Sequence, residues 1–191
     1  LFRAFGRGAW RHAECGKPLT RQGDTTVPIT GIAELNYCVE DLGKCIRFFE
    51  DFGLSRRESS GEHAIFEVVS GQRVNLFRQG DRRIPKSAQV GYGVHECVWA
   101  VDNQADLDGL VKDISRDHDV TTDESGAVHF VTAFGQAIGI QVFQRRPLLS
   151  TLTPTNSPGI INRLNVPRRW STRATPKTIN HLVWGFLDVN Q

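Results

Sequence analysis

The fold is decided by the stretch Gly31-Ile32-Ala33-Glu34-Leu35-Asn36-Tyr37-Cys38-Val39-Glu40-Asp41, which returns 62 positions later as Gly93-Val94-His95-Glu96-Cys97-Val98-Trp99-Ala100-Val101-Asp102-Asn103. In both copies the glycine, the glutamate, an aromatic residue and a valine fall in the same register. Each copy ends on a residue that can cap a helix. Self-similarity at a fixed interval is typical of a repeated supersecondary unit, so we expect two units that fold alike.

Each copy continues with the same order of patterns. Apolar residues at helical spacing follow Asp41 and Asn103, and Gly53 stands where a C-cap glycine belongs. Strand-like runs come next, at 54–58, 63–69, 73–77, 127–132 and 138–143. We therefore predict an α+β fold in which paired βαβββ modules form a cupped mixed sheet with the helices outside.

The chain divides into four parts by pattern. We predict an irregular N-terminal segment, a paired-module domain with modules 29–82 and 90–146, a linker and the first strand of a second domain, at 1–28, 29–146, 147–176 and 177–191. The last assignment rests on residues 179–184, which match 94–99 and put His181 where Glu34 and Glu96 fall. Because the sequence has no methionine and ends inside this pattern, we interpret the chain as the N-terminal portion of a longer protein.

Four polar residues are predicted to meet on one face of the sheet. Side chains alternate faces along a strand, and Phe66 aligns with Phe130 at an interval of 64, whereas the last strands align at 66. Two cupped copies then bring together Glu34, Asn75, Glu96 and Gln141. Amides are poor ligands for iron or zinc, so a polar cavity lining or structural hydrogen bonds are favoured, and a metal site is the alternative.

His181 is the candidate metal ligand. A neutral imidazole suits Fe(II), Mn(II) or Zn(II), although a lone strand histidine is often structural. The other histidines have no spacing that predicts a common site: His12, His63, His95, His118 and His129.

Composition excludes some partners. A net charge of +2 on 191 residues argues against nucleic acid, and no apolar run approaches the ~20 residues that a membrane span needs. The four cysteines form no CxxC pair, so we expect reduced thiols and a cytoplasmic protein.

The residues Glu34 to Leu42, with Phe48-Phe49 and Phe52-Gly53-Leu54, resemble the opening of the vicinal oxygen chelate superfamily, which includes glyoxalase I, bleomycin-resistance proteins and extradiol dioxygenases. The resemblance covers roughly residues 29–146 and resumes at 177. The layout is similar to that of two-domain ring-cleavage dioxygenases, whose first module pair is usually metal-free. The resemblance implies that His181 is the first ligand of a divalent metal, Fe(II) or alternatively Mn(II), bound mainly by residues beyond Gln191.

The implied activity is dioxygen insertion into a small catechol-like aromatic substrate, by a cytoplasmic enzyme of aromatic compound catabolism that we expect to be a homo-oligomer. The chain by itself is expected to be inactive. One alternative is a binding protein without catalysis, similar to bleomycin-resistance proteins. Another is a glyoxalase- or epimerase-like enzyme that uses Glu34 and Glu96 directly on a metal.

Overall fold

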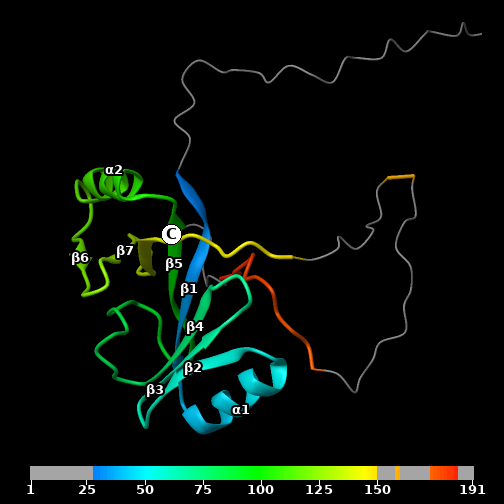
Figure 1. The fold of residues 1–191 in the computed structure, drawn as a ribbon. Coiled ribbons are helices and arrows are strands. Elements are labelled where there is room, and N and C mark those ends of the chain that lie inside the picture. The colour runs from blue at the N-terminus through cyan, green and yellow to red at the C-terminus, as the bar shows by residue number, and fades with distance from the viewer. Residues whose placement is uncertain (1–27, 150–157, 160–172, 185–191) are drawn as a thin grey trace, which may run out of the picture.

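The sequence repeat folds as two βαβββ modules in one sheet (Figure 1). The computed structural model describes residues 28–149, 158–159 and 173–184. The first module consists of β1 (Ile29–Val39), α1 (Leu42–Phe52), β2 (Ser55–Ser59), β3 (His63–Glu67) and β4 (Arg73–Arg78). The second consists of β5 (Gly93–Val101), α2 (Gln104–Ile114), β6 (Thr121–Thr122), β7 (Val128–Val131) and β8 (Ala137–Val142). The predicted fold class is confirmed; the two-residue strand β6 was not predicted.

Both helices begin where the sequence predicts. The side chain of Asp41 accepts a hydrogen bond from the Lys44 backbone N–H at 2.9 Å, and Asn103 caps α2 in the same way. These bonds satisfy N–H groups that have no partner inside a helix. Gly53 ends α1 with a φ of 100°, a left-handed conformation that favours glycine. Both helices pack on the sheet of their own module, α1 against β3 and β4 and α2 against β5 and β8.

The two modules meet at β1 and β5, which pair antiparallel in the strand order β2-β3-β4-β1-β5-β8-β7-β6. Glu34 lies opposite Val98 and Asn36 lies opposite Glu96, so an approximate two-fold axis exchanges the modules. Within each module the first and last strands run parallel, β1 with β4 and β5 with β8.

The pairing corrects one detail of the sequence alignment. Asn75 pairs with Asn36, and Gly139 pairs with Val98, the equivalent of Asn36. The equivalent of Asn75 is thus Gly139, at an interval of 64 and not 66, and Gln141 is equivalent to Phe77. The alignment of the two sequence copies matched residues by side-chain type, whereas the register is fixed by the hydrogen-bonded pairing of the strands. Because the error is two residues, Gln141 stays on the predicted face.

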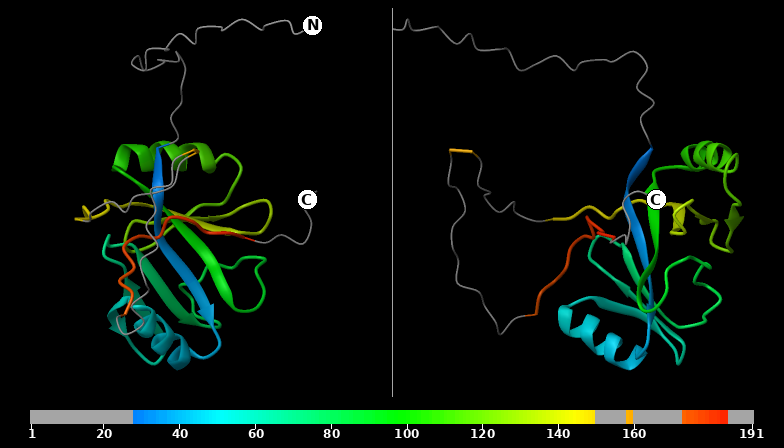
Figure 2. Two further views of the ribbon diagram at one scale, coloured as in Figure 1. Left: turned by 90° about the vertical axis from the view of Figure 1, so that its right-hand side faces the viewer. Right: turned by 180° about the vertical axis from the view of Figure 1, so that it is seen from behind.

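The helices cover the face of the sheet opposite the cup. In the first module a cluster that includes Phe66 and Leu76 packs under α1, and in the second Leu107 of α2 packs on Ile140. Figures 1 and 2 show α1 and α2 at opposite ends of the domain with the strands between them. Cys38, Cys45 and Cys97 carry free thiols, and burial, followed by the charge of Glu96, raises the pKa of Cys97 to about 12.

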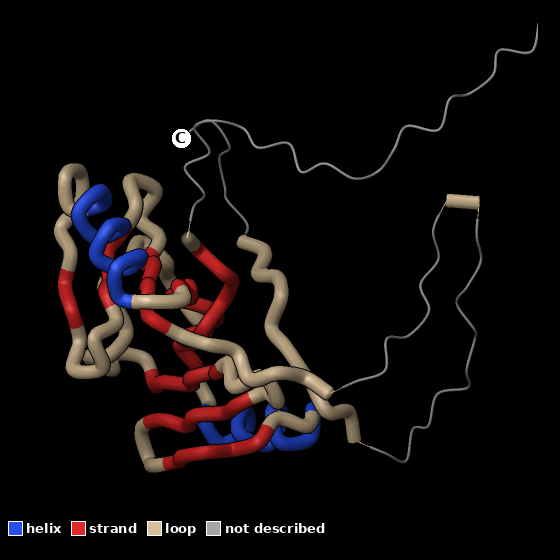
Figure 3. The backbone as a smooth tube through the Cα atoms, turned by 45° about the horizontal axis from the view of Figure 1, so that its top comes forward, coloured by secondary structure: helices blue, strands red, loops and turns tan. Residues whose placement is uncertain are grey.

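Residues 173–184 return to the first module without forming a helix or a strand (Figure 3). The Ser70 N–H donates to the Lys177 carbonyl at 2.9 Å. The buried side chain of Gln72 donates to the Ile179 carbonyl at 2.7 Å and accepts from the Ile179 N–H at 2.8 Å. Ile179, Leu182 and Trp184 pack against a cluster of Ile32, Leu35 and Cys97.

Most of the predicted N-terminal segment and linker lie outside the described residues, as do residues 185–191 of the predicted second-domain strand. Those assignments stay predictions. Neither described helix is long and apolar enough to cross a membrane.

Candidate functional site: the cup between the modules

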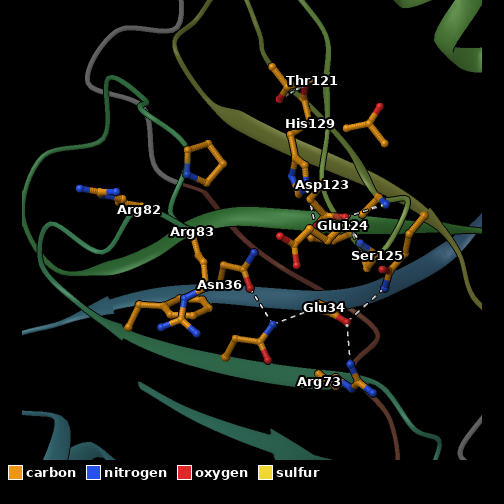
Figure 4. A pocket seen from close by; sticks show the side chains of 17 residues that line it. Glu34, Asn36, Arg73, Arg82, Arg83, Thr121, Asp123, Glu124, Ser125 and His129 are labelled. Atoms are coloured by element: carbon orange, nitrogen blue, oxygen red, sulfur yellow. Dashed lines mark hydrogen bonds and ion pairs between the residues drawn. The ribbon is translucent and has the colours of Figure 1, made fainter. Parts of the chain in front are cut away.

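The concave face of the sheet encloses a cavity of about 790 Å³ to which both modules contribute (Figure 4). Glu34, Asn36 and Arg73 lie on its floor, and the loop after β4 brings Arg82 and Arg83 to one side. Thr121 to Ser125 and His129 form the other side. The wall therefore carries charges of both signs.

The four residues expected to converge do lie together. Asn75 donates to Glu34 at 2.6 Å and to the Asn36 amide oxygen at 2.8 Å. Gln141 donates to the other oxygen of Glu34 at 3.2 Å. Asn36 in turn donates to Glu96 at 2.6 Å. A continuous chain of hydrogen bonds thus joins the two modules across the β1–β5 seam.

This chain of bonds ends at a histidine that sequence reasoning left unassigned. His129 Nδ1 lies 2.7 Å from a Glu96 oxygen, and Nε2 lies 3.2 Å from Asp123. Burial by itself lowers the pKa of His129, but the hydrogen bonds and charges of Glu96 and Asp123 outweigh it and raise the pKa to about 8. The imidazolium therefore compensates Glu96, whose side chain is fully buried.

The donor set of the cup does not fit a catalytic metal. Within the described ranges, no group of three or more His, Cys, Asp and Glu side chains is placed to hold an ion. Both oxygens of Glu34 accept from amides, and those of Glu96 accept from Asn36 and His129. Both nitrogens of His129 already face carboxylates. A metal would have to displace these donors, and the remaining amides are poor ligands for iron.

His181 lies away from the cup, in the segment that follows the module pair. Its side chain is exposed, between Asn180, which is also exposed, and the half-buried Leu182. The structure therefore does not bring His181 together with Glu34 or Glu96, and its role as a ligand stays a prediction.

Two solved dioxygenases share this fold. The halotolerant catechol dioxygenase BphC superposes with a TM-score of 0.51 and 14% identity over 62% of this chain and 41% of that one. The 2,3-dioxygenase LapB from Pseudomonas sp. KL28 gives a TM-score of 0.50 and 14% identity over 62% of this chain and 42% of that one. The chain spans about two fifths of the length of these enzymes.

The paired-module fold of this chain is thus also the fold of these two dioxygenases. At this identity the similarity establishes the fold. No protein-family description and no curated protein matches the sequence.

Proposed function

We propose that this chain is the N-terminal, metal-free module pair of an extradiol-type ring-cleavage dioxygenase that acts on a catechol-like aromatic substrate in the cytoplasm. The observation that carries the proposal is the shared fold with two dioxygenases, of which the chain spans about two fifths. The donor set of the cup supports the metal-free assignment, because its carboxylates are already engaged by amides and an imidazolium.

His181 is the proposed first ligand of the catalytic metal, with the other ligands supplied beyond Gln191. Its exposed imidazole is accessible to a further domain. A bound Fe(II) would act as Lewis acid and as a template that holds the aromatic substrate and dioxygen together. The module pair would contribute to this activity by docking the segment that carries His181. The buried Gln72 holds the backbone of that segment at Ile179.

Dioxygen uptake tests this function. We expect no catechol-dependent uptake by the 191-residue chain supplied with Fe(II), and uptake by a longer protein that continues past Gln191. His181→Ala in the longer protein should abolish uptake. The control is His118→Gln, which removes an imidazole that contacts Phe130 and is far from His181 in the sequence. This variant should retain uptake. Uptake by the chain itself, or uptake that survives His181→Ala, would rule the proposal out.

A further inference from the structure

Equivalent carboxylates have different hydrogen-bond partners in the two modules. Glu34 and Glu96 are exchanged by the two-fold axis. Glu96 receives a charged donor, His129, at 2.7 Å. Ile65 takes the place of His129 in the first module, because it pairs with Asn75 as His129 pairs with Gly139. Glu34 therefore lacks the imidazolium that hydrogen-bonds to its counterpart, and its cationic neighbour is the half-exposed Arg73, in an ion pair at 3.6 Å.

The partners that Glu34 does have leave room for another. It accepts two amide hydrogen bonds, from Asn75 and Gln141. The nearest guanidinium nitrogen, of Arg73, is 3.6 Å away on a side chain that is 50% exposed. A carboxylate offers about four lone pairs, and the Glu34 side chain is 17% exposed on the floor of the cavity. Glu34 is thus able to accept a further donor from inside the cup.

Asn75 supplies an independent observation. The residue lines the same cavity and is only 6% exposed. Its amide nitrogen is engaged by Glu34 and Asn36, which fixes the orientation of the amide group. Its oxygen Oδ1 is buried and has no hydrogen-bond partner in the part of the chain that the structure describes. A buried acceptor without a donor is costly and indicates a missing partner.

We propose that the cup binds a small organic ammonium ion, which donates to Glu34 and to Asn75. An ammonium group carries three donors and no acceptor, which matches a carboxylate beside an orphan amide oxygen. In the second module the His129 imidazolium provides the same kind of donor from within the chain. Pro85, which is half-buried, lines the same cavity and offers an apolar surface to the rest of the ligand.

The other charges around the cup permit a cation. Arg83 pairs with Asp81 at 2.6 Å, and His129 lies between Glu96 and Asp123. Arg82 and Glu124 remain, one of each sign, without a partner among the described residues. A hard divalent cation fits less well, since it takes about six to eight oxygen ligands and most oxygens here already accept hydrogen bonds.

Tyramine and tyrosol are matched probes, because they differ only in an ammonium group against a hydroxyl. Calorimetric titration of the full chain at pH 7 should give tyramine an affinity at least about tenfold higher than that of tyrosol, as expected for a charge-assisted hydrogen bond. Glu34→Gln should remove that preference. Glu62→Gln, which removes an exposed carboxylate outside the cup, should keep it. Melting curves establish that both variants fold.

A second variant uses the repeat itself. Ile65→His places an imidazole where the second module has His129, so it should supply the missing donor and abolish tyramine binding while Glu34 remains. Equal affinity for tyramine and tyrosol would overturn the proposal, as would tyramine binding that survives Ile65→His. Stabilisation of the chain by calcium chloride, dependent on Glu34, in place of tyramine binding would also overturn it. These titrations involve neither dioxygen nor His181, so their outcome is separate from that of the dioxygenase proposal.

Discussion

His129 of β7 and Glu96 of β5 lie 2.7 Å apart across an intervening strand, β8. Gly139 of β8 stands between them: a Cβ there would come within 2.8 Å of Val98 and 3.3 Å of His129 Nδ1. The contact therefore depends on a position without a side chain. The charged pair of Glu96 and His129 lies beneath the cup. In this region of low dielectric, loss of either partner would leave the other as an uncompensated buried charge.

The first prediction concerns pH. The folded-state pKa of His129, about 8, lies above its ordinary value of 6.5. Its protonation therefore adds stability that is fully present below pH 6.5 and is lost as the pH rises through about 8. A shift of this size corresponds to about 2 kcal/mol. Urea unfolding should show that the difference in the free energy of unfolding between the wild type and His129→Gln falls by that amount as the pH rises from 6 to 9. Parallel pH profiles for the two proteins would contradict this origin.

Gly139 gives the second prediction. Gly139→Ala should cost about 1–3 kcal/mol, as overpacking usually does, and should weaken the pH dependence assigned to His129. Gly109 in α2 is the matched control, because a Cβ there meets nothing within 4 Å. Gly109→Ala should stabilise the chain by about 0.5–1 kcal/mol through helix propensity. If both substitutions had the same effect on the urea midpoint, the steric account of Gly139 would be wrong.

The third prediction concerns the docked segment. Gln72 bonds to the Ile32 carbonyl, to both backbone groups of Ile179 and to Ser70. Gln72→Ala should leave several buried groups without partners and cost about 2–4 kcal/mol. It should also speed amide hydrogen exchange at Ile179. Gln136 is the equivalent residue of the second module, and its side chain forms no hydrogen bond to the described residues. Gln136→Ala should therefore leave both the stability and the exchange nearly unchanged, and equal losses in the two variants would refute the assignment.

Much of the cup could be predicted because it follows from strand alternation and the repeat. Glu34 and Glu96 repeat in register, and period-two alternation puts Asn75 and Gln141 on the same face. The interval of 66 assigned to Gln141 was wrong by two residues, an error that alternation does not detect.

His129 could not be assigned from the sequence, because its partners come from different strands and from the turn that carries Asp123. Its repeat partner, Ile65, is apolar, so comparing the copies gave no polar match. The one available signal was a histidine on the cup face of a strand beside a buried glutamate. Arg82 and Arg83 were also missed, since they lie in the loop after β4, outside the strands and helices that the two copies share.

We propose that this module pair holds no catalytic metal and that His181 belongs to the centre that does. Elemental analysis of a longer protein containing this chain tests it most directly. We predict stoichiometric iron or manganese that is lost in His181→Ala and retained in Glu34→Gln and Glu96→Gln. Metal retained without His181, but lost when either glutamate is replaced, would contradict the account.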